Sequence, residues 1–159
     1  MTRRTFAAFA VLAAATVITP AFAAGKPDFS GEWKLNVTKS DFGAIPPPTF
    51  QTMKIDHKDP VLKVVTQQSA ADGDTTINAA YSTDGKETKS DYRGTPTTSV
   101  THWDADTLVI DTQVHYGGAD PTIKATWKLS DDGKSITTNT HVSTPQGDFD
   151  IRSLFEKVK

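Results

Sequence analysis

Turn-forming sequences recur along this chain about every 8–12 residues, and the segments between them are rich in threonine, valine, isoleucine and aromatic residues. Pairs such as Asp72-Gly73 and Asp84-Gly85 favour tight hairpins, because the second position of such a turn prefers a positive φ. This spacing predicts an all-β domain of short strands. The candidate strands are residues 31–37, 49–57, 61–69, 75–83, 87–93, 97–103, 107–116, 122–130, 135–143 and 148–158.

Several of these segments alternate strictly between apolar and polar residues. In one of them, Ile123, Ala125 and Trp127 alternate with Lys124 and Thr126. A period of two with one polar face indicates an antiparallel sheet that has one side in water. Strands joined by tight turns follow one another up and down, and closure into a barrel removes their exposed edges. We therefore expect an antiparallel up-and-down β-barrel of about 8–10 strands.

No stretch of the mature chain shows a sustained helical period. The one helical candidate is a single turn near residues 38–42, directly after the first strand. Pro46, Pro47 and Pro48 follow it and favour an extended linker into the second strand.

The first 23 residues have the three parts of an export signal. Arg3 and Arg4 form a positive start, residues 6–18 form an apolar run, and Ala21-Phe22-Ala23 is a cleavage site. The alternative, a membrane helix, needs about 20 apolar residues, which is more than this run provides. We expect cleavage after Ala23, a β-barrel domain over residues 24–159, and a periplasmic or secreted bacterial location. The general secretory and twin-arginine routes both stay open.

The charge balance and residue usage exclude several partners. The formal net charge is −2 and no basic run follows the signal, so nucleic acid is not an expected partner. Outward positions such as Lys34, Lys124 and Lys128 exclude an outer-membrane barrel, so we expect no membrane spanning after processing. The chain has no cysteine, which excludes disulfides and thiolate metal sites.

No catalytic, metal or cofactor site is predicted. The four histidines show no metal-ligand spacing, and no Gly-x-Ser-x-Gly elbow or phosphate-binding glycine loop is present. Acidic pairs such as Asp104/Asp106 lie beside predicted turns, where aspartate is favoured for its local hydrogen bonds.

The alternation predicts which side chains face the barrel interior. A barrel of about eight strands is just wide enough to be filled by side chains or to hold one small ligand. The predicted interior mixes aliphatic and aromatic residues with small hydroxyl residues, which favours an amphipathic cavity. The candidate ligand-binding residues are Tyr81, Thr98, Val100, His102, Leu108, Ile110, Thr112, Ala125, Trp127, Thr138 and Thr140.

The start of the mature domain carries a family resemblance. Gly31-x-Trp33 in the first strand resembles the Gly-x-Trp signature of lipocalins and the wider calycins. The resemblance implies that Trp33 closes one end of the barrel and that a basic residue of the last strand, Arg152, packs across its ring. It also implies a short helical plug over residues 38–43.

The mature chain as a whole is similar to small exported bacterial lipocalin-like proteins, a group without an activity to transfer. The shared segments include residues 31–36, 39–43, 57–60, 83–87, 107–110, 129–134 and 155–157. We expect a barrel that binds a small apolar or amphipathic molecule without catalysis. The alternatives are a cell-envelope structural or interaction module with a filled barrel, and an isomerase or hydrolase.

Overall fold

The computed structural model of the protein describes residues 25–118 and 120–158. The predicted signal peptide and its cleavage site lie outside these residues, so the division after Ala23 stays a prediction. The elements are β1 (Gly31–Leu35), the 3-10 helix η1 (Val37–Lys39), β2 (Phe50–Lys58), β3 (Val61–Ala70), β4 (Gly73–Ser82), β5 (Asp84–Tyr92), β6 (Thr95–Asp104), β7 (Thr107–Val114), β8 (Thr122–Leu129), β9 (Ser135–Thr144) and β10 (Gly147–Lys157).

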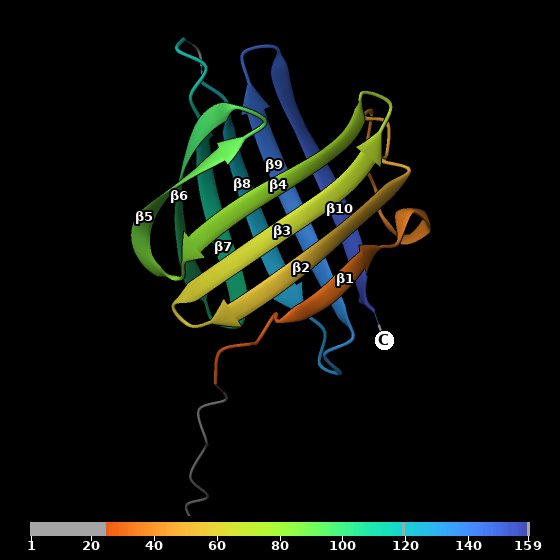
Figure 1. The fold of residues 1–159 in the computed structure, drawn as a ribbon, viewed down its shortest axis with the longest axis vertical. Helices are drawn as coiled ribbons and strands as arrows, with labels where there is room; N and C mark the ends of the chain where they lie inside the picture. The colour runs from red at the N-terminus through yellow and green to blue at the C-terminus, as the bar shows by residue number, and fades with distance from the viewer. Residues whose placement is uncertain (1–24, 119, 159) are drawn as a thin grey trace, which may run out of the picture.

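The strands form one antiparallel sheet that curls into a nearly closed barrel (Figure 1). Their order is β4-β3-β2-β1-β10-β9-β8-β7-β6-β5, so consecutive strands pair except β4 with β5, and β1 pairs with β10. The all-β, up-and-down barrel with a short helical turn after the first strand is thereby confirmed.

The two ends of this strand order, β4 and β5, leave a seam in the barrel wall. A hydrogen bond crosses the seam: the backbone N–H of Ala80 in β4 donates to the side-chain hydroxyl of Ser90 in β5 at 3.4 Å. At one end of the seam, the ion pair between Asp72 and Arg93 joins the β3–β4 turn to the β5–β6 turn. Side chains therefore hold the two edges together.

Burial follows the alternation within the strands. In β2, Met53, Ile55 and His57 are buried while the residues between them are exposed. Hydrophobic burial stabilises the wall by about 25 cal/mol per Å² of apolar surface removed from water. Among the described residues, no helix is long and apolar enough to cross a lipid bilayer.

Candidate functional site: a cavity open at one end of the barrel

We call the end of the barrel near the N-terminal segment the closed end (Figure 1). Phe29, which precedes β1, is fully buried there and stacks on Trp103 with a centroid distance of 5.9 Å. Trp127 meets the same ring edge-on at 5.9 Å. The Phe29 N–H donates to Nδ1 of His57 at 3.3 Å. This aromatic cluster seals the barrel.

Trp33 also lies at the closed end, as the resemblance implies. It is fully buried, and its indole N–H donates to the Phe29 carbonyl at 2.8 Å. The cation above its ring is the ammonium group of Lys157, at 5.1 Å from the ring centroid. Gly31 makes room for this contact, because a Cβ there would lie 3.0 Å from the Lys157 side chain.

The expected pairing of Arg152 with Trp33 is wrong. In the β1–β10 ladder, Trp33 lies opposite Lys157, five residues further along β10. Arg152 lies past the end of β1 and instead pairs with Asn139 and bridges to Asp41 through the backbone. The sequence shows a basic residue in the last strand, whereas the register decides which basic residue reaches the ring.

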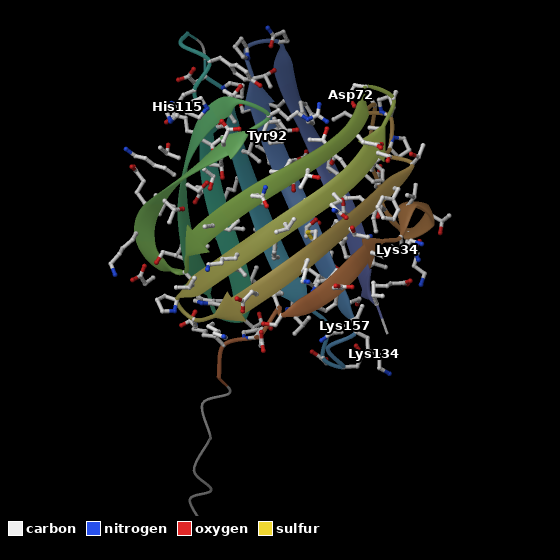
Figure 2. The ribbon with its side chains drawn as sticks, in the orientation of Figure 1. Lys34, Asp72, Tyr92, His115, Lys134 and Lys157 are labelled. Carbon is white, nitrogen blue, oxygen red and sulfur yellow. The ribbon has the colours of Figure 1, made fainter. Side chains whose placement is uncertain are left out.

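A cavity of about 680 Å³ occupies the interior above the closed end, and Trp127 belongs to both. We call its opposite end the mouth, where the β3–β4, β5–β6, β7–β8 and β9–β10 connections lie (Figure 1). Figure 2 shows Asp72, Tyr92 and His115 at this end, and Lys134 and Lys157 at the closed end. The loop before β2 contributes Ile45, Pro46 and Pro48 to the lining.

The structure brings most of the predicted ligand-binding residues together. Those that line the cavity are Tyr81, Ile110, Thr112, Ala125, Trp127, Thr138 and Thr140. They come from β4, β7, β8 and β9, so the wall is built from strands on both sides of the barrel. Leu108 does face inward, but it is fully buried in the hydrophobic core below the cavity. The role of these residues in binding stays a prediction.

The expected inward direction of Thr98, Val100 and His102 is wrong. All three lie on the outer side of β6, where Val100 is 39% exposed and His102 is exposed. The inward positions of this strand are the buried residues Thr97, Ser99 and Thr101. In this strand hydroxyl side chains face the interior and a valine faces water. The apolar residue therefore indicates the outer face, and the prediction assigned it to the inner face.

Sequence analysis also missed several residues that line the cavity. Phe42 and Ile45 lie in the loop before β2, and Tyr92 and Arg93 lie at the β5–β6 turn. The loop before β2 carries no alternation, and the candidate strand 87–93 is almost entirely polar, so periodicity gives no direction for these side chains. The one signal in the sequence is Gly94, a turn-forming residue, and in the structure Arg93 and Gly94 form the hairpin with positive φ (53° and 85°).

The polar groups inside the cavity are mainly neutral. The hydroxyls of Ser99 and Thr112 hydrogen-bond each other at 2.7 Å. Burial raises the pKa of the Tyr81 hydroxyl to about 12, so this group stays protonated at neutral pH. At the mouth, the hydrogen bond and charge of Arg93 lower the pKa of Asp72.

The described residues contain no group of three or more histidine, aspartate or glutamate side chains that could hold a metal ion. The geometry is that of a water-accessible pocket with an apolar wall and a set of hydroxyls. Such a pocket buries a small molecule and orients it by a few hydrogen bonds.

No protein-family model matches the sequence, and no curated protein matches it. Solved structures do resemble the barrel. The zebrafish ileal bile acid-binding protein complexed with cholic acid has a TM-score of 0.56 at 14% identity, over 82% of this chain and 98% of that one. A secretory abundant heat soluble protein of Ramazzottius varieornatus has a TM-score of 0.62 at 16% identity, over 86% of this chain and 98% of that one.

Fatty-acid-binding protein 1 of Echinococcus granulosus has a TM-score of 0.54 at 13% identity, over 82% of this chain and 98% of that one. The fold is a calycin-type barrel. At these identities the likeness establishes the fold, and the expected lipocalin-like architecture is confirmed.

Proposed function

We propose that this calycin-type barrel is an exported binding protein for one small apolar or amphipathic molecule, and that it carries out no chemistry on it. The observation that carries the proposal is the cavity of about 680 Å³. Pockets for small molecules occupy about 300–1,000 Å³ and combine apolar walls with a few polar groups. Ile110, Ala125 and Trp127 supply such a wall, and Thr112 and Thr138 supply hydroxyls.

Two further observations support the proposal. The names of two similar structures identify a bile acid-binding protein and a fatty-acid-binding protein, whose ligands are small amphipathic molecules. The sequence of residues 1–23 has the features of a cleaved signal peptide, which supports a periplasmic or secreted location. The alternative, a cell-envelope interaction module with a filled barrel, is favoured less because the cavity is large.

Filling the cavity tests the proposal. We expect Ala125→Trp to abolish binding of the uncharged fluorescent probe N-phenyl-1-naphthylamine, because the indole ring would occupy the space beside Trp127. The matched control is Val100→Trp, which adds the same ring to the outer face of β6 and is expected to bind the probe as the wild type does. Circular dichroism checks that both variants keep their strand content.

A wild-type protein that binds no apolar probe would support the interaction-module alternative. Equal probe binding by wild type and Ala125→Trp would place the probe outside the cavity and contradict the proposal.

A further inference from the structure

The charged groups of the cavity lie at its mouth. Of the residues that line the cavity, Asp72, Asp91 and Arg93 are charged, and all three belong to the β3–β4 and β5–β6 turns or their flanks. Deeper in the barrel, the polar lining consists of hydroxyls such as those of Tyr81, Ser99 and Thr138. A ligand head group placed there meets hydrogen-bonding partners without a counter-charge.

Among the described residues of the lining, the one cation, Arg93, is already engaged. Nη1 of Arg93 donates to a carboxylate oxygen of Asp72, and the guanidinium lies 5.8 Å from the centroid of the Tyr92 ring. The second carboxylate, Asp91, accepts a hydrogen bond from the Gly94 N–H at 2.6 Å. Two carboxylates against one guanidinium leave the lining with a net charge of −1.

The rim around the mouth extends this negative charge. The described residues of the four connections and their flanks (70–74, 91–95, 114–118, 120–122 and 144–148) contain Asp74, Asp120 and Asp148 in addition to Asp72 and Asp91, and Arg93 is their one arginine. Histidines lie beside two of these carboxylates. His115 is 3.4 Å from Asp120, and His141 is 3.9 Å from Asp148.

These charges oppose an anionic ligand at either depth. Inside the barrel, a carboxylate would lose its hydration without gaining a cationic partner, which is strongly unfavourable. At the mouth it would lie among like charges, whose repulsion is stronger near a low-dielectric surface than in bulk water. A neutral hydroxyl, ester or ketone avoids both penalties and still bonds to the interior hydroxyls.

Resting on the proposed function of the cavity, we propose that the barrel selects uncharged amphiphiles and rejects the matching carboxylates. The ligand class is an apolar chain or ring system that carries a hydroxyl, ester or ketone group. Asp72 and Asp91 set this preference by their negative charge. Asp72 also engages the guanidinium of Arg93, which is then not free to pair with a ligand carboxylate.

A matched pair of ligands tests the selectivity. Dodecanol and dodecanoate have chains of the same length, and each is titrated below its aggregation threshold against the neutral probe near neutral pH. We expect dodecanoate to bind at least about tenfold more weakly, which corresponds to about 1.4 kcal/mol. Raising the salt from about 0.01 M to about 1 M shortens the Debye length from about 30 Å to about 3 Å and should narrow this difference.

A second experiment removes the negative charges of two aspartates at the mouth. The double variant Asp72→Asn/Asp91→Asn frees Arg93 and removes two like charges, so the ratio of the two affinities should fall several-fold. The matched control is Asp131→Asn, in the exposed β8–β9 turn at the closed end, which should keep the wild-type ratio.

Dodecanoate binding that equals or exceeds dodecanol binding in the wild type would overturn the selectivity while leaving the proposed function standing. An unchanged ratio in the double variant would overturn the role of the two aspartates. Failure of both ligands to displace bound probe, or failure of the probe itself to bind, would overturn the proposed function together with the selectivity that rests on it.

Discussion

Glycine is favoured at position 31 by its backbone conformation and by the approach of the Lys157 side chain. Its φ of 134° lies in a region that residues with a Cβ rarely adopt. A Cβ there would also press on the Lys157 side chain at 3.0 Å, and this side chain carries its ammonium group over the Trp33 ring. The Gly-x-Trp pair therefore lets a cation from the last strand reach the aromatic ring of the first.

Substitutions at these residues have graded expected effects. Gly31→Ala should lower the free energy of unfolding by more than about 1 kcal/mol, because alanine is strained at a positive φ. Lys157→Met keeps the alkyl chain but loses the cation–π contact with Trp33, with an expected cost of about 0.5–1 kcal/mol. Urea unfolding, followed by tryptophan fluorescence, measures both.

The matched control is Arg152→Met, at the basic residue that the family resemblance implied as the partner of Trp33. We expect its unfolding free energy to equal that of the wild type, since the ammonium group that lies over the Trp33 ring is that of Lys157. A loss of stability in Arg152→Met without one in Lys157→Met would contradict the assignment. The family resemblance could identify Trp33 and the kind of partner, whereas the choice between two basic residues of the last strand needed the β1–β10 register.

At the scale of elements, the β3–β4 and β5–β6 turns are joined by one ion pair. The hydrogen bond from Arg93, together with its charge, lowers the pKa of Asp72 below the ordinary value of 3.8. A carboxyl whose pKa is lower in the folded state stabilises that state above the pKa of the unfolded chain, and this contribution is lost as the pH falls through the folded value. The link between the turns should therefore weaken below about pH 4.

The titration of Asp72 tests this link. In a ¹³C NMR titration of side-chain carboxyl groups, the pKa of Asp72 should rise toward its ordinary value in Arg93→Gln. The carboxyl of Asp132, whose pKa is lowered by a hydrogen bond from Ser130 in the β8–β9 turn, serves as an internal control, with no change expected. If the pKa of Asp72 is the same in the wild type and in Arg93→Gln, then Arg93 does not lower the pKa of this carboxyl group.

The strands differ in how well their sequences predicted the direction of their side chains. In β8, lysines on the outer face make the alternation unambiguous, and Ala125 and Trp127 line the cavity as predicted. In β6, the inner face carries hydroxyls while Val100 lies outside. Hydrophobic alternation marks a face correctly where the interior is apolar and fails where a cavity is lined by threonine and serine.

At the scale of the whole molecule, turn spacing and alternation were sufficient to predict an up-and-down barrel. They could not predict the seam between β4 and β5, because each strand has the same kind of pattern whether or not its edge is paired. They also could not establish an open interior. The cavity depends on how side chains from facing walls interdigitate, and register and barrel curvature decide this.

The closed end makes the fold depend on a residue that precedes the first strand. Phe29 is fully buried against His57, Trp103 and Trp127, and a cleavage after Ala23 would retain it in the mature chain. Phe29→Ala would remove a core ring and leave a void, with an expected loss of about 3–5 kcal/mol. The total free energy of unfolding of such a domain is about 5–15 kcal/mol, so the midpoint of urea unfolding should fall markedly.

Phe50→Ala is the matched control, because Phe50 is 41% exposed at the start of β2 and its ring contributes much less buried surface. We expect its unfolding midpoint to stay close to that of the wild type. Equal losses in the two variants would contradict the sealing role of Phe29. A large loss confined to Phe29→Ala would show that the segment before β1 completes the barrel by filling the end that the strands leave open.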